Sequence, residues 1–245
     1  MDKETLRERV WDELEESGVA RFPFPPHGRI PNFAGAKDAA DRLTDQPEWE
    51  KAETIKANPD APQLPVRRAA LRAGKTVYMA VPRLADEQCF LVLDPDELED
   101  YDAATTVSGS SEYGTQVGPE AVGKLDLIVS GSVAVTDDGG RVGKGEGYSD
   151  LEYAMLYELG LVDEETPVAT TVHERQVFER GGDGDRSQDS VDLTFDAHDV
   201  SMDLIVTPER VLRPDAGTTE PAGIDWDRLE DERLEEMPVL KRLSP

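Results

Sequence analysis

The sequence predicts an α/β fold in which three layers, αβα, surround an open and mostly parallel sheet. Short apolar runs of strand length alternate along the chain with segments of helical periodicity, a pattern typical of a sheet covered by helices on both faces. A chain of 245 residues, 38% of them hydrophobic, can bury a real core as one large domain. Ligands of such sheets bind beyond the carboxyl ends of the strands.

The expected elements follow in a regular order. A helix is predicted over residues 2–17, because Leu6, Val10 and Leu14 fall on one stripe, and the four prolines of 21–33 predict an extended loop. Strands are expected at 54–57, 75–81, 88–93, 125–130, 167–172 and 203–207. Further helices are expected at 34–43, 65–73 and 150–160.

The last part of the chain contains two polar segments. Residues 179–192, rich in Gly and Asp, are interpreted as a mobile insertion, and residues 213–223 as a linker. Residues 224–243 are expected to form one amphipathic helix. Its packing side chains are Trp226, Leu229 and Leu234. We therefore expect an α/β domain over 1–212, with a linker and a C-terminal helical tail over 213–245.

The composition is strongly acidic and indicates a salt-rich cytoplasm. The formal net charge is −27, and halophiles use such charge for solubility, so we expect a halophilic, haloarchaeal protein. The alternative is an acidic protein that binds a basic partner. The sequence shows no basic stripe, which argues against nucleic-acid binding. The lone Cys89 is expected to be a buried thiol, and neither a signal peptide nor a membrane span is visible, so a cytoplasmic location without membrane association is expected.

The stretch RVGKGEGYSD, residues 141–150, is the strongest candidate for a binding loop. Gly143, Gly145 and Gly147 allow a close approach of the backbone to a ligand, and Asp150 is placed to cap the helix that follows. A glycine-rich turn before a helix N-terminus is a natural anion site. The alternative is a tight turn whose glycines serve packing alone.

Several common motifs do not fit this sequence. The loop lacks the GxxxxGK pattern of a P-loop, and a hairpin-like DDGGR precedes it where a dinucleotide fingerprint needs a strand. The three histidines, His27, His173 and His198, are scattered and no paired cysteines exist, which argues against zinc. The sequence also lacks the GxSxG elbow of serine hydrolases, which argues against that class of enzyme. His198, beside Asp199, is the histidine of most interest.

The run SGSVAVTDDGGRVGKGEGYSD, residues 130–150, resembles the signature of the 5-formyltetrahydrofolate cyclo-ligase family, also called methenyltetrahydrofolate synthetases. That signature ends in an arginine, a Gly-x-Gly-x-Gly run, two tyrosines and an aspartate. The loop is especially similar to that of a divergent branch, the synthetase domain-containing proteins. Some of these carry an RNA-binding module, which we do not expect here.

Further segments resemble the family in the right order. Lys3 and Arg7 look like its N-terminal basic pair, VHERQVF (172–178) like a strand with a glutamine, and AHDVSMDLIVTPERV (197–211) like its C-terminal segment. The resemblance covers residues 1–212. It implies a three-layer αβα fold of the NagB/RpiA/CoA transferase-like type, in agreement with the pattern of elements.

The resemblance also implies a reaction, in which MgATP phosphorylates the formyl oxygen of 5-formyltetrahydrofolate and N10 attacks the activated carbon. The products are 5,10-methenyltetrahydrofolate, ADP and phosphate. Phosphoryl transfer depends mostly on positioning and charge neutralisation. Backbone N–H groups of Gly143, Gly145 and Gly147 are expected to cradle phosphates, with Lys144 and Arg141 neutralising the transferring group.

The remaining implied roles belong to residues outside the glycine run. Lys3 and Arg7 are expected to reach the ATP phosphates from the first helix. Asp150 and Asp199 are expected to hold Mg²⁺, which prefers carboxylate oxygens and waters. Tyr148 is expected to stack on the pterin or to orient it.

Three departures from the family pattern leave two hypotheses. Ser149 stands where the signature has its second tyrosine, and Glu146 adds a negative charge beside the expected phosphates. Where the enzymes carry a folate-binding glutamate, residues 58–68 read NPDAPQLPVRR, with Asp60 as the nearest acid. The chain is then either an ATP-dependent cyclo-ligase or a repurposed nucleotide-binding paralogue. A pocket closed by Pro62 and Pro65 would favour the paralogue, and an acid facing the pterin would favour the enzyme.

Overall fold

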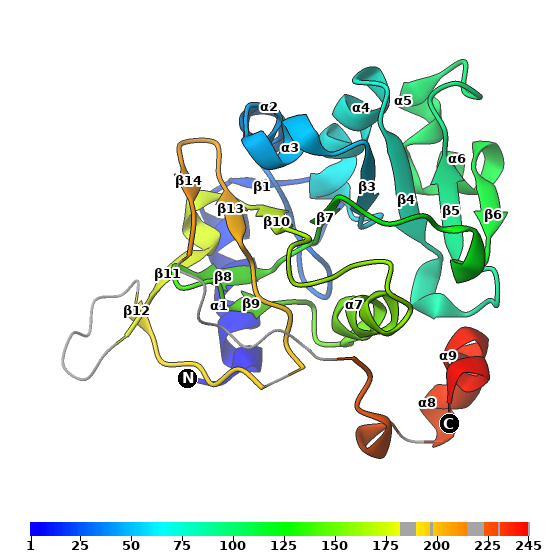
Figure 1. The fold of residues 1–245 in the computed structure, drawn as a ribbon. Helices are drawn as coiled ribbons and strands as arrows, with labels where there is room; N and C mark the ends of the chain where they lie inside the picture. Colours follow the sequence, from blue (N-terminus) through cyan, green and yellow to red (C-terminus); the bar gives the residue numbers. More distant parts are fainter. Residues whose placement is uncertain (182–189, 197, 215–222, 230, 245) are drawn as a thin grey trace.

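A computed structural model describes residues 1–181, 190–196, 198–214, 223–229 and 231–244. Among these residues, eight strands form the main sheet in the order β14-β13-β10-β7-β3-β4-β5-β6 (Figure 1). Their bounds are β3 (Thr54–Ala57), β4 (Thr76–Ala80), β5 (Phe90–Leu93), β6 (Thr115–Val117), β7 (Leu127–Val129), β10 (Val168–Thr171), β13 (Leu204–Val206) and β14 (Val211–Leu212). The five strands from β13 to β4 are parallel, and at the edges β14 pairs antiparallel with β13, β5 with β4, and β6 with β5. The sheet is mostly parallel, as predicted.

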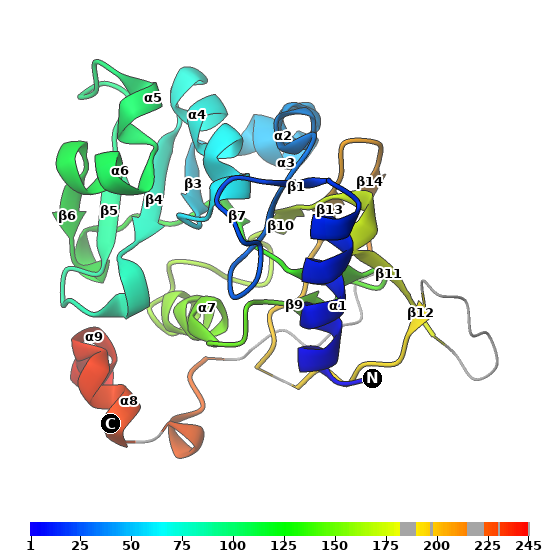
Figure 2. The same cartoon turned by 180° about the vertical axis from the view of Figure 1, so that it is seen from behind.

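Helices cover both faces of this sheet, which makes three layers (Figures 1 and 2). The helices other than α1 are α2 (Ala36–Thr44), α3 (Pro47–Lys51), α4 (Leu64–Arg72), α5 (Tyr101–Ala104), α6 (Val107–Tyr113), α7 (Tyr148–Glu158), α8 (Asp231–Glu236) and α9 (Pro238–Leu243). Alternate residues of β4 face opposite layers, since Val77 and Met79 pack with α2 and α4 while Tyr78 packs with α7.

A second sheet, of order β12-β11-β8-β9, lies beside the first helix, α1 (Lys3–Glu16). Its strands are β8 (Ala134–Thr136), β9 (Arg141–Val142), β11 (Val177–Arg180) and β12 (Ser190–Val191), and a separate pair consists of β1 (Ala20–Arg21) and β2 (Asn32–Phe33). The apolar stripe of α1 packs on this sheet, with Leu6 and Leu14 fully buried. The sequence did not predict this sheet as a unit, because its strands come from separate parts of the chain and are defined by their pairing with one another.

The six predicted strands are confirmed within about two residues at each end, but other expectations are wrong. The single helix over 224–243 is instead a 3₁₀ turn at Trp226–Arg228, followed by α8 and α9. Pro238 would interrupt one continuous helix, because it has no N–H to donate and its ring clashes with the preceding turn. It is instead the first residue of α9, where the missing N–H costs no hydrogen bond.

The polar segments lie largely outside the described residues. The ends of the predicted insertion 179–192 belong to β11 and β12, while its middle and most of the predicted linker 213–223 are not described. The segment VHERQVF is a strand only from Val177 onward. Gln176 ends a 3₁₀ turn before it, where its side-chain amide donates to the carbonyls of Ser132 and Val133.

Candidate functional site

A cavity of about 1120 Å³ lies beyond the carboxyl ends of β3 and β4, where the fold class predicts a ligand site. The segments that line it come from the first helix, the turns after β3 and β4, the glycine loop, the start of α7 and the C-terminal segment. All ten residues predicted from the sequence line this one cavity: Lys3, Arg7, Arg141, Gly143, Lys144, Gly145, Gly147, Tyr148, Asp150 and Asp199. The fold therefore brings together residues 196 positions apart in the chain, such as Lys3 and Asp199.

The glycine loop, residues 143–147, connects β9 to α7 and leaves its backbone donors available. Gly145 has φ +100° and Gly147 has φ +69°, values at which a side chain would be strained. Within the described part of the chain, no N–H from Gly143 to Gly147 donates to a protein acceptor. Gly147 caps α7, so these donors lie at the positive end of a helix dipole. The loop can therefore bind an anion.

Asp150 was expected to cap the helix, and that expectation is wrong. It lies in the first turn of α7, where its Oδ1 accepts from Arg141 Nη2 at 2.8 Å and from the Val200 N–H at 3.1 Å. Burial opposes ionisation of this carboxyl, but Arg141 and the hydrogen bonds outweigh that effect and lower its pKa. Arg141, 5% exposed, also donates to the Gly131 carbonyl at 2.8 Å. This pair fixes the loop to the helix.

Two cationic side chains of α1, Lys3 and Arg7, line the same cavity as the loop. Arg7 donates through Nε to the Gly143 carbonyl at 2.7 Å and pairs with Glu4 at 2.6 Å. Lys3 pairs with Asp199 at 2.5 Å. Lys3 and Arg7 of α1, Arg141 of β9 and Lys144 of the loop itself thus bring positive charge to one cavity.

Glu146, which departs from the family signature, forms an ion pair with Lys144, the residue predicted to neutralise the phosphate. Its carboxylate lies 2.6 Å from Nζ of Lys144, and both side chains are 40% exposed. Exposed pairs of this kind are weak, so Lys144 can exchange this partner for another anion at small cost.

The carboxylates predicted to hold Mg²⁺ line the cavity, but both already accept hydrogen bonds from protein groups. Asp150 is held by Arg141, and Asp199 by Lys3 and by the Asp196 N–H. Among the described residues, no group of three or more His, Cys, Asp or Glu could hold a metal ion. Mg²⁺ in phosphoryl-transfer sites is commonly held by one or two carboxylates with waters and phosphates, so these two aspartates fit that ion in kind.

A buried polar network that the sequence did not predict lies under the loop. Lys56 of β3 and Glu152 of α7 form an ion pair of 2.8 Å with side chains 3% and 6% exposed. Lys56 also donates to Asn58 at 2.6 Å, and Asn58 donates to the Ser149 hydroxyl at 2.9 Å. The lysine within the apolar run TIKA could have indicated this network, because a buried lysine is rare unless it is paired with an acid.

The cavity extends over residues 58–68, the stretch where the family's enzymes carry the folate-binding glutamate. Asp60 lines it, whereas Pro62 and Pro65 do not, so these prolines do not close the pocket. Arg67 shapes the turn by donating to the carbonyls of Asn58 at 2.5 Å and Asp60 at 3.0 Å. Burial raises the pKa of the Asp60 carboxyl, and the charges of Lys144 and Arg67 oppose this shift.

The histidines and the cysteine have separate places. His198, the histidine of most interest in the sequence, lines the cavity. His27 lies 3.0 Å from Asp12 on the surface of α1, and His173 caps a 3₁₀ turn. Cys89 is buried as predicted, and burial raises the pKa of its thiol to about 12.

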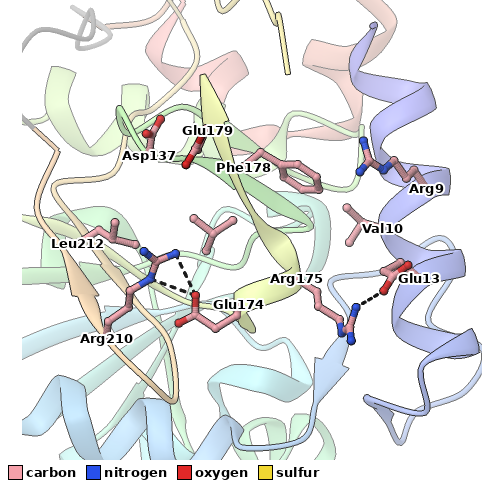
Figure 3. A pocket seen from close by; sticks show the side chains of 11 residues that line it. Arg9, Val10, Glu13, Asp137, Glu174, Arg175, Phe178, Glu179, Arg210 and Leu212 are labelled. Carbon is pink, nitrogen blue, oxygen red and sulfur yellow. Dashed lines mark hydrogen bonds and ion pairs between the residues drawn. The ribbon is translucent and has the colours of Figure 1, made fainter. Parts of the chain in front are cut away.

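A smaller cavity of about 460 Å³ lies between α1, β11 and β14 (Figure 3). Two ion pairs belong to its lining, Arg175 with Glu13 and Arg210 with Glu174. None of the residues predicted from the sequence lines it. The larger cavity is therefore the candidate site.

The sequence of this chain is similar to a known family and to several curated proteins. Residues 1–208 match the 5-formyltetrahydrofolate cyclo-ligase family. Proteins named methenyltetrahydrofolate synthase domain-containing protein are 40% identical in Bos taurus, over 99% of this chain and 62% of that protein, and 36% identical in Homo sapiens, over 99% and 61%. The chain thus spans about three fifths of the length of these relatives.

The fold has a counterpart among solved structures. A 5,10-methenyltetrahydrofolate synthetase from Aquifex aeolicus superposes with a TM-score of 0.52 at 21% sequence identity, covering 88% of this chain and 94% of that chain. This similarity shows the three-layer fold. Among the described residues, no helix has the length and apolarity needed to cross a bilayer.

Proposed function

This chain belongs to the 5-formyltetrahydrofolate cyclo-ligase family, and we propose that it cyclises 5-formyltetrahydrofolate, or a related reduced pterin, to 5,10-methenyltetrahydrofolate with consumption of ATP. ADP and phosphate are the other products. The observation that carries this proposal is the convergence of the ten predicted residues on one cavity at the carboxyl edge of the sheet. Family membership supports a folate ligase, and the free donors of the glycine loop support a phosphate ligand.

ATP would supply the phosphoryl group that activates the formyl oxygen for attack by N10. The chain's part is to position the reactants and to neutralise charge. The N–H groups of Gly143 to Gly147 bind phosphate oxygens, and Lys144 leaves Glu146 to neutralise the transferring group. Lys3 and Arg7 add positive charge from α1.

Other residues hold this arrangement together. Arg141 fixes the loop through Gly131 and Asp150 and contributes its charge from a buried position. Asp150 and Asp199 are the carboxylates that would hold Mg²⁺ together with phosphates and waters. Tyr148 orients the pterin, and Asp60, whose pKa is raised by burial, hydrogen-bonds to the pterin amino edge.

A second candidate function is a nucleotide-binding paralogue that no longer cyclises folate. Two observations favour it: Lys144 is held by Glu146, and the hydroxyl of Ser149 bonds to Asn58 where the signature has a tyrosine. This paralogue would bind MgATP through the same loop.

An absorbance assay separates the two functions. The protein is mixed with MgATP and 5-formyltetrahydrofolate, and the near-ultraviolet band of the methenyl product is followed. A rise that requires both ATP and the protein supports the ligase. A flat trace with nucleotide binding still measurable by calorimetry supports the paralogue.

A further inference from the structure

The described C-terminal residues, 223–229 and 231–243, follow the residues 1–208 that match the family model, yet they pack into the core. Ile224, Val239 and Leu240 are buried in the same apolar cluster as α7. The Ile224 N–H donates to Glu158 at the end of α7, at 3.3 Å. Figures 1 and 2 show α8 and α9 on the side of the sheet that α7 covers. The segment is thus fixed beside the glycine loop.

Arg233 of α8 lies beside three successive residues, the last two of that loop and the first of α7. Its Nη2 donates to the carbonyl of Glu146, and its guanidinium lies 5.1 Å from the ring centroid of Tyr148. A Cβ added at Gly147 would lie 3.5 Å from the same Nη2. Arg233 also lines the candidate cavity, together with Ile224 and Leu229 of its own segment.

These contacts constrain one peptide group. In a planar trans peptide the C=O and the N–H point in opposite directions. By holding the carbonyl of Glu146, Arg233 fixes the direction of the Gly147 N–H, which is one of the free donors at the start of α7. Without that contact the peptide could rotate, because glycine resists such rotation least.

The charge of Arg233 is also available to a ligand. Its Nε is buried and finds no acceptor among the described residues, and none of the described carboxylates forms an ion pair with it. Glu146, whose carbonyl it holds, carries the negative charge that departs from the family signature. A guanidinium at this place offsets that charge beside the expected phosphates.

We infer that Arg233 is a positioning residue for phosphate binding, supplied to the glycine loop by the C-terminal segment. It orients the Glu146–Gly147 peptide and restores positive charge where Glu146 has removed it. The inference rests on the proposed function for the identity of the ligand, a nucleoside triphosphate. Its physical content is wider, since any polyphosphate bound by the loop depends on Arg233.

Calorimetry with MgATP and with inorganic tripolyphosphate tests this inference on the full chain. Arg233→Ala weakens the affinity for both by about tenfold, the effect of one charge-assisted hydrogen bond. Arg233→Lys recovers most of this loss, because a lysine keeps the charge and can donate to the carbonyl. The matched control is Arg242→Ala, which removes an exposed ion pair with Glu120 outside the cavity and changes affinity by less than about twofold.

The outcomes are distinct for the inference and for the proposed function. Equal affinity in Arg233→Ala and the wild type overturns the inference and leaves the function standing. A loss that Arg233→Lys does not recover, with an equal loss of stability, also overturns it, since the role is then structural. A wild-type protein that binds neither probe overturns both. Arg233-dependent binding without methenyl formation supports the inference and contradicts the cyclo-ligase.

Discussion

Replacement of Lys144 by alanine separates binding from folding at the glycine loop. Its ion pair with Glu146 spans 2.6 Å between side chains that are each 40% exposed. Such pairs contribute about 0–1 kcal/mol, so Lys144→Ala lowers the free energy of unfolding by less than about 1 kcal/mol. A charge-assisted hydrogen bond to phosphate contributes about 1.5–3 kcal/mol, less the cost of leaving Glu146. We expect the affinity for MgATP to fall by about tenfold.

The partner residue provides the matched control. Glu146→Gln removes the competitor for Lys144, so the affinity for MgATP should rise by about twofold to threefold. Calorimetry at about 0.1 M and about 1 M KCl measures both effects, and both shrink at the higher salt because exposed charges are screened. Unchanged affinity in Lys144→Ala, or weaker binding in Glu146→Gln, would refute the assignment of Lys144 to phosphate.

Three further predictions concern buried groups. Glu152→Gln leaves Lys56 buried without its carboxylate and should cost about 3 kcal/mol in a urea unfolding experiment, and a loss below about 1 kcal/mol contradicts a buried ion pair. Because the folded-state pKa of Asp150 is lowered, its stabilisation is present above the unfolded value of 3.8 and is lost as the pH falls through the folded value. Unfolding curves of Asp150→Asn should therefore depend less on pH in that acidic range, and identical pH dependence would exclude the pairing with Arg141. Cys89, with a pKa of about 12, should react with a thiol reagent at neutral pH only after unfolding, and rapid reaction of the folded protein would show that it is accessible.

The sequence predicted the parts of this molecule that depend on local pattern. The buried strands of the main sheet are apolar runs such as LDLIVS and DLIVT, and their length and flanks distinguish them from helices. The glycine loop was recognisable because its positive-φ positions require glycine. That Lys3 and Arg7 belong to the same site as the loop was implied by the resemblance to the cyclo-ligase family.

The rest depends on contacts between distant residues. The strands of the second sheet have two to four residues each, and their pairing with one another is what defines them. Asp150 reads as a cap from its position, but Arg141 lies in reach only because β9 passes beside α7. Lys56 and Glu152 are 96 residues apart, and no local signal pairs them. The haloarchaeal origin inferred from the acidity stays a prediction.

The most direct test of the central claim is the ratio of ADP to methenyl product formed in one incubation with MgATP and 5-formyltetrahydrofolate. An ATP-dependent cyclo-ligase forms the two products in equal amounts, since each ring closure consumes one ATP, and Lys144→Ala lowers both together. ADP formation without methenyl product would contradict the claim and indicate another phosphoryl acceptor at the same loop. Methenyl product without ADP would contradict the role of ATP.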